Sequence, residues 1–195
     1  YENKIDFRPK NFLEITSVDK RYSKFAIANK VNQKNRKILA PIGGGKDAVV
    51  TYEVLKNAKQ TIIPFILNPK KEQLDFLKFA EARGVIAQRT IDPKLLELNK
   101  EGYLNGHTPF SAYLAFLTTL SAELLNCTYI ALSNERSSNE GNVQYLGHEI
   151  NHQYSKSFEF EKKFRLYSSK YLTQNIEYFS FLRPLYELQI TKLFS

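Results

Sequence analysis

Short apolar runs alternate with amphipathic stretches over most of the chain. The runs are apolar at nearly every position, which is typical of strands buried on both faces of a parallel sheet. The stretches between them place apolar residues at helical spacing. The predicted strands cover residues 37–42, 61–67, 85–91 and 129–132. The predicted helices cover residues 48–59, 70–83, 92–99 and 108–126, and the last of these is apolar nearly all round, so we expect it to be buried.

Alternating strands and helices predict an α/β fold with a doubly wound, mostly parallel sheet. Apolar bursts in residues 1–36, with a turn at 18–23, predict an N-terminal antiparallel hairpin leading into that sheet. Because the sequence contains no methionine, we expect residues 1–36 to be the end of a longer N-terminal region. Residues 37–195 are expected to form one domain. The aromatic residues after 171 are expected to pack on the sheet, and Pro184 to open a final helix through 193, giving a helical C-terminal extension.

Three consecutive glycines at 43–45, followed by Lys46 and Asp47, separate the first predicted strand from the first predicted helix. A loop without Cβ atoms lets backbone N–H groups approach a ligand, and the helix N-terminus favours an anion there. The loop therefore predicts a phosphate site, the plainer alternative being a turn that binds nothing. Asp47 stands where a Walker A loop needs Ser or Thr. A dinucleotide fold needs an acidic residue after the next strand, which ends at Asn68 instead.

A polar segment at residues 133–142 directly follows the fourth predicted strand. Working groups of parallel sheets gather at the carboxyl ends of strands, where the glycine loop also lies. Glu135 is placed to hold magnesium together with Asp47, and Arg136 to bind pyrophosphate or a carboxylate. A long solvated loop is the alternative interpretation.

A second polar segment, residues 148–159, contains His148 and His152 four residues apart. Residues 148–152, His-Glu-Ile-Asn-His, match the His-Glu-x-x-His spacing of zinc proteases, in which the two histidines lie on one helix face; we favour a base or a phosphate-binding residue over a zinc site. His152 and Lys156 share one face if the segment is helical.

The net charge of +8 favours an anionic partner: a nucleotide, a nucleotide-sugar or RNA. The lysines are scattered, so nucleic acid is left open and not favoured. The single cysteine, Cys127, excludes internal disulfides and paired Cys-x-x-Cys metal sites. With no signal peptide and no run able to span a bilayer, we expect a cytoplasmic protein without a membrane partner; the oligomeric state is not predicted.

Residues 43–48 resemble the PP-loop of ATP pyrophosphatases, Ser-Gly-Gly-x-Asp-Ser/Thr, with Gly43 and Ala48 replacing the hydroxyl residues. A larger set of segments resembles, in order, the UDP-N-acetylmuramoyl-L-alanyl-L-glutamate epimerases of bacterial peptidoglycan synthesis. These segments are residues 41–47, 105–107, 133–137, 151–157 and 179–185.

The resemblance implies an ATP-dependent epimerase that inverts the terminal L-Glu of a nucleotide-sugar dipeptide to D-Glu. The carboxylate would be adenylated, with release of AMP and pyrophosphate. Magnesium is assigned to Asp47 with Glu135. The residues assigned to the β and γ phosphates of ATP are Gly43, Gly44, Gly45, Lys46 and Asp47.

Proton transfer is assigned to His107 or His152, and the choice between them stays open. Lys156 and Arg136 would balance the phosphate charge. Two alternatives remain from the sequence. One is another PP-loop adenylating enzyme, either tRNA-modifying or amide-forming. The other is a nucleotide-binding domain without catalysis, which the loss of a hydroxyl at Ala48 would favour.

Overall fold

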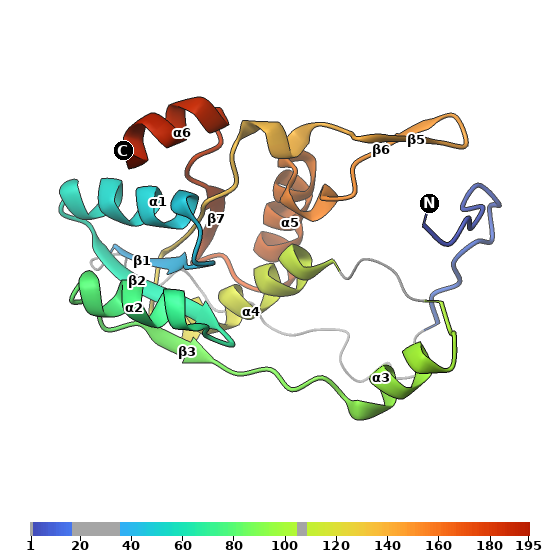
Figure 1. Ribbon diagram of the computed structural model, residues 1–195, viewed down its shortest axis with the longest axis horizontal. Coiled ribbons are helices and arrows are strands. Elements are labelled where there is room, and N and C mark those ends of the chain that lie inside the picture. The colour runs from blue at the N-terminus through green and yellow to red at the C-terminus, as the bar shows by residue number, and fades with distance from the viewer. Residues whose placement is uncertain (1, 17–35, 105–108) are drawn as a thin grey trace.

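The computed structural model describes residues 2–16, 36–104 and 109–195, and at its centre lies a five-stranded parallel sheet (Figure 1). The strand order is β3-β2-β1-β4-β7. The strands are β1 (Lys37–Pro41), β2 (Thr61–Leu67), β3 (Val85–Ala87), β4 (Tyr129–Leu132) and β7 (Glu177–Ser180). The chain builds outward from β1 to β3, then continues on the other side of β1 with β4, so the topological switch point lies between β1 and β4.

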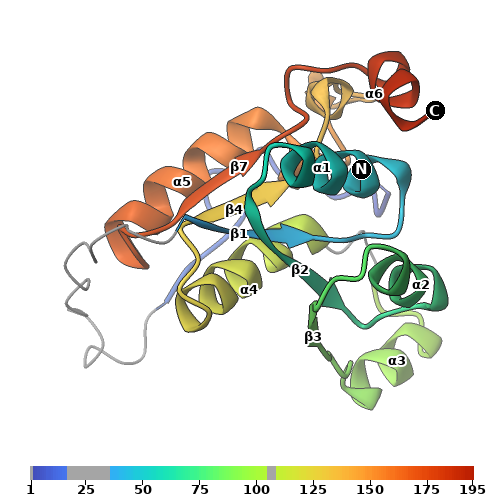
Figure 2. The same cartoon turned by 90° about the vertical axis from the view of Figure 1, so that its left-hand side faces the viewer.

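Helices cover both faces of the sheet, which confirms the predicted doubly wound α/β class (Figure 2). Adjacent residues of β1 point to opposite faces: Leu39 packs in a cluster with α4 and α5, whereas Ile38 packs against α1. Burial on both faces explains why the strands are continuously apolar. The helices are α1 (Lys46–Asn57), α2 (Lys71–Phe79), α3 (Pro93–Lys100), α4 (Phe110–Leu124), α5 (Phe158–Tyr171) and α6 (Glu187–Phe194).

The C-terminal extension is helical, as expected, but it begins later than predicted. Pro184 lies in a turn and α6 starts at Glu187. Ile190 of α6 packs with Val50 of α1 and Leu182, so α6 is fixed beside the helix that follows the glycine loop. Strand β7 and helix α5 were not predicted as elements. The aromatic residues of β7 were attributed only to packing on the sheet, and no element was predicted for the residues of α5.

A small antiparallel hairpin, β5 (Val143–Tyr145) and β6 (His148–Ile150), projects from the domain (Figure 1). Its turn residues Leu146 and Gly147 both have positive φ, 51° and 79°, which suits the twist of a two-residue hairpin. The 3-10 turns η1 (Arg136–Asn139) and η2 (Tyr154–Lys156) flank it. The helical alternative for residues 148–156 is therefore wrong, and His152 and Lys156 share no helical face.

The N-terminal hairpin is not seen where it was expected. Residues 2–16 contain no strand, and the remainder of the predicted hairpin falls in 17–35, outside the described residues. Strand β3 also ends at Ala87 rather than at 91.

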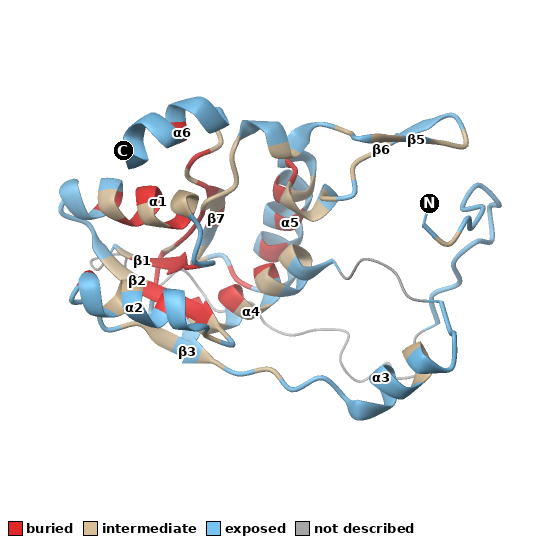
Figure 3. Ribbon diagram, in the orientation of Figure 1, coloured by how far each residue is buried: buried red, intermediate tan, exposed pale blue. Residues whose placement is uncertain are grey.

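Helix α4 is buried on one side only, contrary to the expectation of burial nearly all round (Figure 3). Ala115 and Ala122 are fully buried, whereas Leu120 and Leu124 are 59% and 75% exposed. In the part of the chain that the structure describes, no helix combines the length and apolar character required to traverse a bilayer.

Candidate active site

The glycine loop joins β1 to α1 at the switch point of the sheet. Gly44 has φ of +86°, which a residue with a Cβ adopts only with strain. The loop is fixed by helix α2, because the Gln73 side-chain amide donates to the carbonyl of Gly43 at 3.1 Å. Among the described residues, no heavy atom lies within 4 Å of the position a Cβ would take at Gly43 or Gly45. The loop is thus both constrained and open beside its backbone.

Lys46 and Asp47 form the first turn of α1, directly after the helix N-cap Gly45. Lys46 Nζ lies 2.9 Å from Asp47 Oδ1 and 2.7 Å from Oε1 of Glu187 in α6. These two carboxylates, Glu187 first, raise the pKa of Lys46 above its ordinary value. The predicted phosphate-binding lysine is therefore fully charged and held at the edge of the loop.

A pocket of about 320 Å³ opens beside the loop, lined by Gly43, Asn68, Lys70, Gln73 and Arg89 together with apolar side chains of β1, β2 and α4. Asn68, directly after β2, exchanges two hydrogen bonds with the backbone of Arg89, at 2.9 and 2.6 Å. The Arg89 guanidinium lies over the rings of Phe110 and Tyr113. No binding role was assigned to Asn68, Gln73 or Arg89 from the sequence. The position of Asn68 directly after a strand was a usable signal.

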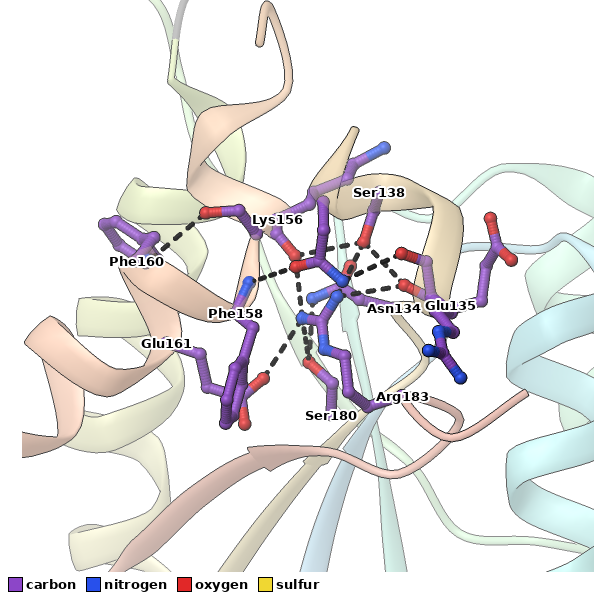
Figure 4. Close-up of polar contacts among 12 residues, drawn as sticks. Asn134, Glu135, Ser138, Lys156, Phe158, Phe160, Glu161, Ser180 and Arg183 are labelled. Carbon is purple, nitrogen blue, oxygen red and sulfur yellow. Dashed lines mark hydrogen bonds and ion pairs between the residues drawn. The ribbon is translucent and has the colours of Figure 1, made fainter. Parts of the chain in front are cut away.

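The polar segment after β4 is held by the guanidinium of Arg183 (Figure 4). Its Nη1 donates to the carbonyl of Glu135 at 2.9 Å and to Ser138 Oγ at 2.7 Å. Its Nη2 donates to the carbonyl of Lys156 at 2.7 Å and to Glu161 Oε2 at 3.1 Å. One largely buried side chain thus fixes the segments that carry Glu135 and Lys156 next to each other.

Glu135 lies in the loop after β4, and Asp47 lies in the first turn of the helix that follows β1. Both predicted magnesium ligands are therefore at the carboxyl edge of adjacent strands. One Glu135 carboxylate oxygen accepts from Ser137. The other is buried and has no hydrogen-bond partner within the described residues. Arg136, by contrast, lies over the ring of Tyr186, 4.9 Å from its centroid.

His152 and Lys156 line a second pocket of about 390 Å³ with the first turn of α4 and the rings of Tyr154 and Phe160. Phe110 lines this pocket and also the one beside the glycine loop, so the two adjoin. His148 lies apart, its ring 5.5 Å from that of Phe7. His107 falls outside the described residues. Within them, no group of three side chains is arranged to hold a metal such as zinc.

An open glycine loop and a helix N-terminus at the switch point define an α/β protein of the kind that binds ligands beyond the carboxyl ends of its strands. More specifically, the chain belongs to the MurL N-terminal domain family, whose model matches residues 1–181. The resemblance drawn from the sequence is thereby confirmed.

Two relatives are named UDP-N-acetyl-alpha-D-muramoyl-L-alanyl-L-glutamate epimerase. The protein of a Micromonospora species is 36% identical over 168 residues, which are 86% of this chain and 38% of that protein. The protein of Xanthomonas oryzae is 36% identical over 162 residues, which are 80% of this chain and 35% of that protein. The chain thus spans little more than a third of the length of these relatives.

Among solved structures, the U34-tRNA thiolase NcsA of Methanococcus maripaludis, with its [4Fe-4S] cluster, is similar to this chain with a TM-score of 0.53. The identity is 12%, and the match covers 82% of this chain and 55% of that one. The likeness concerns the fold alone. Residues 1–195 contain a single cysteine, too few thiolates to hold such a cluster by cysteines.

Proposed function

We propose that this chain is the ATP-using part of an epimerase that inverts the terminal L-Glu of UDP-MurNAc-L-Ala-L-Glu to D-Glu. The family of the chain and the names of its relatives support the substrate. The observation that carries the proposal is the open glycine loop at the switch point, with a ligand-sized pocket beside it.

The residues present fit the polyphosphate of ATP. The free space beside Gly43 and Gly45 is where a phosphate chain can approach the backbone, and the N-terminus of α1 favours its charge. Gly43 to Asp47 would hold the β and γ phosphates, with Lys46 exchanging a carboxylate partner for phosphate oxygens. The adjoining pocket, in which apolar side chains stand beside Asn68, Lys70, Gln73 and Arg89, would take the nucleoside.

Magnesium fits the same edge. The ion is commonly held by one or two carboxylates together with phosphate oxygens and water. One carboxylate oxygen of Glu135 is buried and accepts no hydrogen bond from any of the described residues, so it is available to an ion. Asp47 supplies a second carboxylate. These two residues would bind the ion, which would offset phosphate charge.

Ala48 bears on the alternative of an inactive domain. Its side chain is 5% exposed and packs with Ile42 and Ile66. A hydroxyl at this position would face apolar side chains rather than the open side of the loop. The burial of Ala48 therefore weakens the missing hydroxyl as an argument for a domain without catalysis.

ATP would supply AMP to the terminal carboxylate with release of pyrophosphate, which removes the carboxylate's negative charge and acidifies the neighbouring Cα–H. A base then takes this proton and an acid returns one to the opposite face. Hydrolysis of the mixed anhydride by water would then release AMP and restore the carboxylate of the inverted residue. His152 lines a pocket that adjoins the proposed nucleotide pocket, which supports it as one of these groups. His107 remains the other candidate. Lys156 and Arg136 would offset the negative charge of substrate and phosphate.

The test is the identity of the nucleotide product. The protein is incubated with ATP, magnesium and either UDP-MurNAc-L-Ala-L-Glu or tRNA, and AMP, ADP and D-Glu are quantified. We expect AMP and D-Glu with the dipeptide only. Asp47→Asn should abolish AMP release, whereas Asp75→Asn, an equal charge change on the exposed face of α2, should not. AMP release with tRNA alone would favour the tRNA-modifying alternative, and parental AMP release by D47N would contradict the loop assignment.

A further inference from the structure

The second pocket, lined by His152, Lys156 and Phe110, carries positive charge without a compensating acid. No Asp or Glu is among the described residues that line it. Lys156 has no ion-pair partner in the described chain, whereas Lys71, Lys94 and Lys163 pair with carboxylates on their own helices. A half-buried lysine without an ion-pair partner in the lining of a pocket is suited to a carboxylate or phosphate ligand.

The position of this pocket relates it to the proposed nucleotide site. Phe110, at the start of α4, lines both pockets, so a single side chain borders both of them. Arg183 bonds the carbonyls of Lys156 and Glu135 with the same guanidinium, which fixes the Lys156 turn against the proposed magnesium ligand (Figure 4). The pocket is therefore part of one preorganised site rather than a separate surface hollow.

We propose that this pocket binds the side-chain carboxylate of the substrate's terminal glutamate, with Lys156 as its counter-ion. The inference rests on the proposed function. The terminal residue carries two carboxylates, and the one that is activated must face the nucleotide. The remaining carboxylate then lies toward the neighbouring pocket. With a volume of about 390 Å³, the pocket suits the end of the peptide rather than the whole nucleotide-sugar. Lys156 would thus make the site specific for an acidic terminal residue.

The test is equilibrium binding by calorimetry, which does not depend on turnover. The ligands are UDP-MurNAc-L-Ala-L-Glu, its L-Gln analogue and UDP alone. The proteins are the parent, Lys156→Gln and the control Lys192→Gln, which removes an equal charge from exposed α6. Because the glutamine ligand replaces a charge-assisted hydrogen bond to Lys156 by a neutral one, the parent should bind the glutamate ligand about tenfold or more tightly than the glutamine ligand.

In K156Q this preference should fall close to one, whereas K192Q should keep it, and UDP should bind all three proteins alike. Three results would overturn the inference: no glutamate preference in the parent, a preference that survives in K156Q, or a loss of UDP affinity in K156Q, which would assign the pocket to the diphosphate. The first result needs no variant, so misfolding of K156Q leaves the inference open to refutation. A protein with the expected preference but no AMP release would contradict the proposed function and leave this inference standing.

Discussion

Lys46 and Glu187 form an ion pair of 2.7 Å that connects the glycine loop to the last helix of the chain. The side chain of Lys46 is 28% exposed and that of Glu187 59%, so the pair lies at the rim of the loop. Helix α6 is anchored on α1 through Ile190, which holds Glu187 in reach. A carboxylate at this rim competes with any phosphate for the same lysine.

Removing that competition should strengthen nucleotide binding. Glu187→Gln is expected to lower the Kd for ATP up to about fivefold, because an exposed pair is worth at most about 1 kcal/mol. Glu53→Gln, on the same α1 helix but in a long 4.0 Å pair with Lys56, is the control and should bind ATP like the parent. Calorimetric titration measures all three. Weaker ATP binding by E187Q would show that the pair supports the loop rather than competing for Lys46.

Adjacent glycines of the loop should respond differently to the same added methyl group. In Gly44→Ala the Cβ would sit at φ +86° and 3.3 Å from the Gln73 side chain, so we expect unfolding free energy to fall by about 1–2 kcal/mol. Gly45 has φ −91° and open space, so Gly45→Ala should lose less stability. Urea unfolding measures both.

Gly45→Ala also tests what the space beside the loop is for. Its methyl group would point into the volume assigned to the ATP phosphates, so ATP affinity should fall even though the fold is kept. The same calorimetric titration with ATP gives the answer. If G45A bound ATP as tightly as the parent, the phosphates would have to lie elsewhere.

The sequence was sufficient for the parts of the fold that repeat one local pattern. Buried parallel strands such as β2 are continuously apolar, and the glycine loop marks the strand-to-helix turn on its own. Helix α4 shows the limit. Its composition indicates burial all round, but only contacts across the sheet decide that Ala115 faces inward and Leu124 outward.

The candidate site was predictable only where residues follow strands directly. Asp47 and Glu135 were placed at the correct edge because parallel strands bring their carboxyl ends together. Arg183, in contrast, is not identified by any such local signal. Its role depends on carbonyls of residues 135 and 156, and no local pattern encodes such long-range contacts.

The buried pair of Arg183 and Glu161 should be costly to break from one side. Arg183→Met leaves the carboxylate of Glu161 without its ion partner at 6% exposure, and we expect a loss of about 3–5 kcal/mol in unfolding free energy. Adding Glu161→Leu should restore part of that loss. The matched exposed pair, Arg165 with Glu177 at 2.8 Å, should lose under about 1 kcal/mol in Arg165→Met. Additive losses in the R183M/E161L cycle would mean that the two charges do not interact.

Tyr178 should govern part of the alkaline unfolding of the protein. Burial, with a smaller contribution from Glu161, raises the pKa of its hydroxyl well above the ordinary value. A raised folded pKa means that stability is intact below about pH 10, where the unfolded tyrosine begins to ionise, and is lost as pH rises toward the folded pKa. Urea unfolding at pH 8 and pH 11 should show a smaller loss in Tyr178→Phe than in the parent. The control Tyr171→Phe, at an exposed position, should lose as much unfolding free energy between the two pH values as the parent. If Y178F also lost as much as the parent, the alkaline sensitivity would belong to another group.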